Sequence, residues 1–223
     1  MLGRGPFSIG TVLMSVNPPD APTIGVDELT RTLTSIYLKF IPGASNGGSL
    51  ITGYLLYRDQ GVAGSPFELI YNGTKAPEMI LYNVTELMTG HYYNFKLFSM
   101  NEIYVSELFG SIKVLIATIP AQPKKPEFVT ASLADKTIKV TWDEPKYIGG
   151  IPMDRYDLWI DNGADVWSIT PITFNPPAGD KTFQYTFTML TPGLYYQIKV
   201  QAVNEIGASL TSEVSYFVCA DIP

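Results

Sequence analysis

A segment that occurs twice is the sequence feature that most constrains the fold. The stretch LMTGHYYNFKLFSMNEIYVS (87–106) aligns with LTPGLYYQIKVQAVNEIGAS (190–209). Upstream of each stretch, a glycine pair and a tyrosine recur in the same order, Gly47-Gly48 and Tyr54 in the first copy and Gly149-Gly150 and Tyr156 in the second. The period of about 102 residues predicts two copies of one small structural unit.

Short runs of alternating apolar and polar residues occur throughout both copies. Clear examples are TSIYLKF (34–40), KTIKVTW (136–142) and FQYTFTM (183–189). A side-chain period of two predicts strands, and turn-forming clusters such as NGG, DNG and NPPAGD lie between the runs. Since no window of a dozen residues has a helical stripe, the sequence predicts an all-β sandwich or barrel.

The recurring residues resemble fibronectin type III domains, twice over. The second copy has the family's leading proline, second-strand tryptophan and glycine-containing corners, at Pro126, Trp142, Gly149-Gly150, Tyr156, Leu190, Tyr196, Ala202–Gly207 and Ser209. The first copy matches at Pro22, Gly47-Gly48, Tyr54, Leu87, Tyr93, Asn101 and Ser106. It departs from the family pattern at Phe40 for the tryptophan, Ser99 for the alanine and Tyr104 for the corner glycine. The resemblance covers residues 19–223 and implies two tandem seven-stranded immunoglobulin-like sandwiches, residues 19–119 and 120–223.

Eight of these residues form the fold signature that the resemblance implies, namely Phe40, Tyr54, Leu87, Tyr93, Trp142, Tyr156, Leu190 and Tyr196. Phe40 and Trp142 are expected as large buried aromatic anchors between the sheets of each sandwich. Tyr93 and Tyr196 resemble the tyrosine corner, whose hydroxyl group pairs with a backbone group at a strand crossover. Gly48 and Gly150 are expected to allow turns with a positive φ.

The residues before and between the two copies carry further predictions. Residues 2–8 align with residues 206–212 at twice the repeat period, which predicts that residues 1–18 are the end of a preceding repeat in a longer array. The alternative is a short extended leader that matches by chance. The joint IPAQPKKP (119–126) has three prolines in eight residues. It therefore predicts a short, semi-rigid connector in a rod-like segment.

Composition argues against two classes of partner. The net charge is −6, and no basic stripe with interleaved aromatic residues is visible, which argues against binding to nucleic acid or to a charged membrane surface. No apolar run approaches the roughly 18 residues that a spanning helix needs, so this segment is not expected to insert into a membrane. The expected partners are other proteins or neighbouring repeats of the same chain.

The residue types that catalysis or metal binding would need are sparse. His91 is the only histidine and is predicted at the surface before a strand, and Cys219 is the only cysteine and is predicted as a small buried apolar residue. Neither belongs to a triad, and no phosphate-cradling loop is present. The spacing of the acidic set Asp154, Asp157, Asp161 and Asp165 does not fit a calcium loop, and Asp161-Asn162-Gly163 is interpreted as a hairpin turn. We expect no enzyme activity, no cofactor and no metal.

Two N-glycosylation sequons indicate in which cellular compartment the protein is expected. Asn72-Gly73-Thr74 and Asn83-Val84-Thr85 match the N-glycosylation pattern. Asn72 falls in a predicted turn and Asn83 alternates toward solvent, so both asparagines are expected to be sterically available. They favour an extracellular or cell-surface glycoprotein over an intracellular one.

The sequence therefore predicts a structural or adhesive protein-interaction module, a segment of a large multi-repeat protein. Tyr104, which stands where a glycine is expected, is predicted to pack on a neighbouring domain or to contact a partner. One alternative is an intracellular scaffold of the cytoskeleton or cilium, which the lack of disulfides permits. Another is a pair of accessory, non-catalytic modules of a large enzyme whose catalytic domain lies elsewhere.

Overall fold

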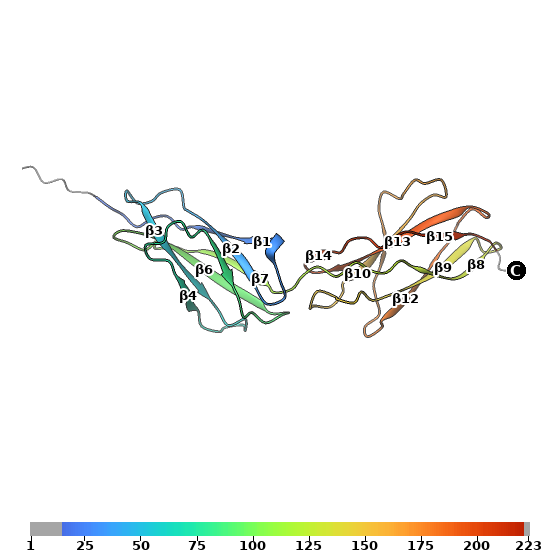
Figure 1. The fold of residues 1–223 in the computed structure, drawn as a ribbon, viewed down its shortest axis with the longest axis horizontal. Helices are drawn as coiled ribbons and strands as arrows, with labels where there is room; N and C mark the ends of the chain where they lie inside the picture. The colour runs from blue at the N-terminus through green and yellow to red at the C-terminus, as the bar shows by residue number, and fades with distance from the viewer. Residues whose placement is uncertain (1–14, 221–223) are drawn as a thin grey trace, which may run out of the picture. The chain divides into compact units, whose positions relative to one another are not determined.

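The computed structural model describes residues 15–220, and these residues are strands and loops apart from a single 3-10 turn, η1 (Glu28–Thr30). The prediction for residues 1–18 therefore lies outside the described residues, except at 15–18. The chain divides into two compact units, one that contains residues 37–84 and 92–114 and one that contains residues 29–36, 85–91 and 115–220. Below, the first repeat means β1–β7 with their loops, and the second repeat means β8–β15 with theirs (Figure 1). The predicted boundaries, 19–119 and 120–223, stay a proposal.

Seven antiparallel strands in two sheets make up the first repeat (Figure 1). One sheet has the order β1-β2-β5, with β1 (Thr23–Asp27), β2 (Ile36–Ile41) and β5 (Leu81–Val84). The other has the order β4-β3-β6-β7, with β4 (Glu68–Asn72), β3 (Ile51–Arg58), β6 (Tyr92–Asn101) and β7 (Gly110–Leu115). The run predicted at 34–40 is β2, and its alternate residues Ile36, Leu38 and Phe40 are all buried. A period of two thus places one face of the strand in the core.

The second repeat has the same arrangement with one additional short strand (Figure 1). Its smaller sheet has the order β12-β9-β8, with β12 (Thr182–Phe187), β9 (Thr137–Asp143) and β8 (Glu127–Ser132). Its larger sheet has the order β11-β10-β13-β14, with β11 (Ile172–Phe174), β10 (Arg155–Ile160), β13 (Tyr195–Asn204) and β14 (Gly207–Ala208), and β15 (Ser215–Val218) also pairs with β13. These sheets confirm the predicted all-β sandwich class.

Aromatic side chains fill both cores. In the second repeat, the Trp142 ring lies 5.7 Å from the Tyr156 ring and 5.0 Å from the Phe174 ring, both edge-on. In the first repeat, Phe40 takes the place of the tryptophan, with its ring 5.5 Å from that of Tyr54. Because aromatic rings bury large apolar areas, these clusters are a main source of stability in each repeat.

Candidate interaction sites

The eight signature residues lie in the cores. None of them is more than 8% exposed, whether in the first repeat or in the second. Tyr196 also makes the contact that defines a tyrosine corner, because its hydroxyl oxygen accepts a 2.7 Å hydrogen bond from the Thr191 amide. Residues buried to this degree shape the scaffold and leave partner contacts to loops and sheet faces.

An asparagine at the end of the long strand β13 ties the incoming chain to the second repeat. The Asn204 amide group donates to the Thr118 and Ile148 carbonyl groups, at 2.9 Å each. Its side-chain oxygen accepts from the Ile206 and Gly207 amides, at 3.0 and 3.2 Å. One side chain thus pairs four backbone groups that the ladder hydrogen bonds do not reach.

The same clamp recurs in the first repeat, at the end of β6. Asn101 donates to the carbonyl groups of Asn17 and Asn46, at 2.8 and 3.0 Å, and accepts from the amides of Ile103 and Tyr104, at 3.1 and 2.8 Å. The sequence pattern places both asparagines in the family motif but does not indicate this role. The identity of Asn-Glu-Ile in both copies was the available signal.

Glycines make room for the incoming chain. A Cβ atom at Gly149 would lie 2.0 Å from the Thr118 carbonyl oxygen, and one at Gly47 would lie 2.0 Å from that of Asn17. The following residues, Gly48 and Gly150, have φ values of 87° and 85°, which confirms the predicted positive φ. The glycine pair is therefore needed both for the turn and for the close approach of the chain.

Tyr104 lies in the corner that follows β6. Its backbone is fixed, because its amide donates to Asn101 and its carbonyl oxygen accepts from the Asn101 amide at 2.9 Å. Its side chain is 44% exposed and that of the preceding residue, Ile103, is 62% exposed. The corner therefore presents apolar side chains on a rigid backbone, which suits a contact surface.

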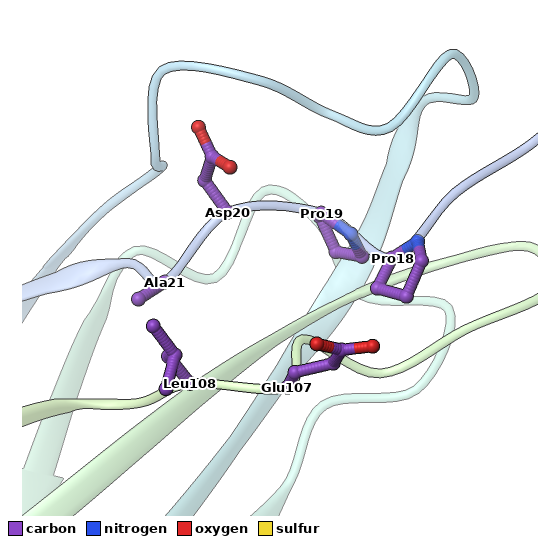
Figure 2. Close-up of a pocket in the computed structure, with 6 residues that line it drawn as sticks. All are labelled: Pro18, Pro19, Asp20, Ala21, Glu107 and Leu108. Carbon is purple, nitrogen blue, oxygen red and sulfur yellow. The ribbon is translucent and has the colours of Figure 1, made fainter.

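A small hollow lies beside the chain that enters the first repeat (Figure 2). Its volume is about 210 Å³, and Figure 2 shows Pro18, Pro19 and Ala21 on one side and Glu107 and Leu108 on the other. The Ser99 hydroxyl group donates to the Asp20 carbonyl oxygen at 2.8 Å and fixes the backbone on the side of the hollow that Pro18, Pro19 and Ala21 form. In the second repeat, Gln122 stands at the place of Ala21 and donates to the Thr211 carbonyl oxygen at 2.7 Å. A hollow of this kind can accept one apolar or cationic side chain.

The residues that could have suggested chemistry lie apart from one another. The Cys219 side chain is fully buried, which confirms its prediction as a small buried residue. His91 is half-buried, and its carbonyl oxygen accepts from the Ile116 amide at 2.9 Å. Within residues 15–220 there is no group of three histidine, cysteine or acidic side chains that could hold a metal ion.

A buried aspartate follows the third strand of each repeat, and the sequence pattern did not predict its bonding role. Asp161 accepts from the amides of Gln197 and Asp165, at 2.8 and 3.2 Å. Its counterpart Asp59 accepts from the amides of Gly61 and Asn94, at 3.1 and 3.0 Å. Asp161 therefore fixes the hairpin that begins at its position.

Both sequon asparagines are exposed in the first repeat. Asn72 ends β4, and its side-chain oxygen accepts from the Thr74 amide and hydroxyl group, at 3.1 and 2.6 Å. Asn83 lies within β5. The Tyr82 hydroxyl group donates to the Ile70 carbonyl oxygen at 3.2 Å, which brings β5 next to β4. The two sequons thus lie along one side of the sandwich, on the outermost strands of its two sheets.

Together, the strand order and the buried signature define a class, the immunoglobulin-like β-sandwich proteins built from repeats. A model of the family described as "Fibronectin type III domain" matches residues 122–218. The second repeat is thus a fibronectin type III domain, and the recognition made from the sequence is confirmed.

The relatives of the chain are long proteins. "Fibronectin type-III domain-containing protein 3A" of Mus musculus is 28% identical over 164 residues, which are 72% of this chain and 13% of the relative. "Myosin-binding protein C, slow-type" of Homo sapiens is 26% identical over 219 residues, which are 86% of this chain and 17% of the relative. The chain thus spans less than a fifth of either protein. The solved two-domain fibronectin type III segment of chicken tenascin is 17% identical, with a TM-score of 0.46 over 89% of this chain and 99% of that segment.

Residues 15–220 contain no helix with the length and hydropathy that a membrane crossing requires.

Proposed function

We propose that this chain is a non-catalytic structural and protein-interaction segment of a longer multi-repeat protein. The duplicated asparagine clamp is the observation that carries the proposal. The Ile116 amide is bonded to the His91 carbonyl oxygen, and the Thr118 amide is bonded to that of Gly149. Only Ala117 lies between these two anchored residues, so the connector between the repeats is shorter than the proline-containing joint 119–126. A short connector supports the proposed stiff, rod-like segment.

Nitrogen-15 relaxation of the whole chain tests this function. A stiff joint gives both repeats one common rotational correlation time, because they tumble as one body. Asn204→Ala removes the bond that ties Thr118 of the incoming chain to the second repeat, and we expect it to lower the correlation time of each repeat toward that of a single domain. Two different short correlation times in the unmodified chain would refute the rod.

The partners in this proposal are other proteins. A relative that is named for binding myosin supports a protein partner. The corner with Tyr104 and the hollow of Figure 2 are the surfaces that we assign to contacts with a partner or with a neighbouring repeat. Tyr104→Gly restores the family's corner residue, and it should weaken crosslinking of the native protein at this corner without lowering its melting temperature.

The proposed setting is the cell surface or the extracellular space, because both sequons are exposed. Mass spectrometry of the native protein, before and after enzymatic removal of N-glycans, tests it. Glycans at Asn72 and Asn83 would support the proposal. Two unmodified asparagines would favour the intracellular scaffold, which the similarity to a myosin-binding protein independently supports.

A further inference from the structure

The outer face of the sheet β4-β3-β6-β7 in the first repeat carries aromatic rings and lysines. Along β6, Phe95 and Leu97 are fully buried in the core, so Lys96 and Phe98 project from the opposite face. The Phe98 ring lies 5.7 Å from the Tyr57 ring and 5.4 Å from the Phe109 ring. These residues, together with Phe67, Tyr92 and Lys113, are called the lysine face below.

The two lysines of this face rest on aromatic rings. The Lys96 ammonium group lies 3.9 Å from the centroid of the Phe67 ring and 4.7 Å from that of Phe109. The Lys113 ammonium group lies 4.3 Å from the centroid of the Tyr92 ring. Ring contacts of this kind attract the cations and fix their positions.

Neither lysine has a carboxylate partner within residues 15–220. Lys39, on the other sheet, pairs with Asp27 at 3.5 Å. The chain carries a net charge of −6, so two lysines without a carboxylate partner on one face form a local positive patch on an acidic chain. A positive patch on an acidic protein is suited to an anionic partner.

A hollow of about 430 Å³ opens on this face, and Lys96, Lys113, Phe67 and Phe109 are among its lining residues. Asp59 is the carboxylate in its lining. It is buried, and its oxygens accept hydrogen bonds from Gly61 and Asn94. The hollow therefore offers two cations beside apolar walls, with its one carboxylate already bonded elsewhere.

The second repeat has the same lysine beside a different loop. Lys199, which aligns with Lys96, lies 4.2 Å from the centroid of the Trp167 ring. In the adjacent loop, Asp165 accepts a hydrogen bond from the Gln197 side chain. The corresponding loop of the first repeat has Gly64 and Ser65 in the lining of its hollow. These two residues carry no charge, so this part of the lining brings no carboxylate to Lys96.

We propose that the lysine face binds an acidic segment of a partner protein. An aspartate or glutamate carboxylate of the segment lies between Lys96 and Lys113, and an adjacent apolar side chain packs on the Phe98 and Phe109 rings. This inference rests on the proposed interaction function and adds the chemistry of the partner. The net negative charge of the chain excludes general attraction of acidic peptides, so binding has to be local.

The test is an NMR titration of the whole ¹⁵N-labelled chain with a capped peptide of four Glu-Leu pairs. We expect shift changes at the amides of Lys96, Phe98, Phe109 and Lys113, and weaker binding as salt is raised. A capped peptide of four Lys-Leu pairs, with the same apolar content, should not bind. Equal binding of both peptides, or shift changes confined to other surfaces, would overturn the proposal.

Substitutions locate the charge requirement. Lys96→Gln with Lys113→Gln keeps most of each side-chain stem and should raise the dissociation constant by about fivefold. Lys96→Arg should retain binding, and Lys39→Gln, which removes a paired lysine from the other sheet, should leave it unchanged. Unchanged affinity in the double variant would refute the assignment. If the Glu-Leu peptide fails to bind while the native protein still crosslinks to a partner, this inference falls and the proposed function stands.

Discussion

Two tyrosines in the core of the second repeat use their hydroxyl groups in opposite ways, and this contrast gives a quantitative prediction. The Tyr196 oxygen accepts a 2.7 Å hydrogen bond from the Thr191 amide. The Tyr156 oxygen is buried and has no hydrogen-bond partner within residues 15–220. Substitution by phenylalanine removes the same atom at both positions, so the difference between the two variants isolates the hydrogen bonding.

The expected magnitudes follow from what each substitution leaves behind. Tyr196→Phe leaves the Thr191 amide without its acceptor, which should lower the free energy of unfolding by about 1–3 kcal/mol. Tyr156→Phe removes a buried hydroxyl group that gains nothing in return for its lost hydration, so it should leave the free energy of unfolding unchanged or raise it by about 1 kcal/mol. The two variants should therefore differ by about 1–4 kcal/mol.

Urea unfolding followed by tryptophan fluorescence provides the assay. The chain has three tryptophans, Trp142, Trp159 and Trp167, and all of them lie in the second repeat. The fluorescence signal therefore reports this repeat alone, which keeps a two-state analysis applicable to a two-repeat chain. A Tyr156→Phe variant that is destabilised as much as Tyr196→Phe would refute the hydrogen-bond assignment.

Trp142→Ala should lower the free energy of unfolding of the second repeat by about 3–5 kcal/mol in the same assay, since it empties the centre of an aromatic cluster, and a loss below about 1 kcal/mol would contradict its anchoring role. Asn204→Ala should increase hydrogen exchange at the Ile206 amide, which bonds to the removed oxygen, and unchanged protection would count against the clamp. Burial raises the pKa of Tyr54 and Tyr156 above the ordinary value of 10.0, so the folded chain keeps protons that the unfolded chain releases. Stability should hold below pH 10 and fall as the pH rises further, as measured by urea midpoints, with a smaller fall in Tyr156→Phe; equal slopes for both proteins would speak against this linkage.

The all-β class and much of the core could be predicted from the sequence because their signals are local. Alternation over 136–142 places Ile138, Val140 and Trp142 on one face, and all three are buried in β9. Burial at a period of two is set by the strand itself, so it needs no knowledge of the neighbours. The internal repeat additionally predicts that Phe40 occupies in the first repeat the position that Trp142 occupies in the second.

The clamps and the hollows could not be predicted, because they depend on residues far apart in the chain. Asn204 reaches Thr118, which is 86 positions away, and only the folded chain brings the two together. The hollow of Figure 2 exists where Ala21 leaves space that Gln122 fills in the other repeat. The lysine face could be predicted only in part. Alternation in β6 predicts that Lys96 faces outward, but its contacts with Phe67 and Phe109 could not be predicted because these rings come from other segments.

The central claim is that the two repeats are self-sufficient β-sandwiches with separate cores. The most direct measurement is a ¹H–¹⁵N spectrum of the whole Trp142→Ala chain at a urea concentration that unfolds its weakened second repeat. The account predicts that amides of the second repeat collapse to unfolded positions while those of residues 37–84 and 92–114 keep their folded positions. Simultaneous loss of the folded signals from both repeats would show one shared core and contradict the account.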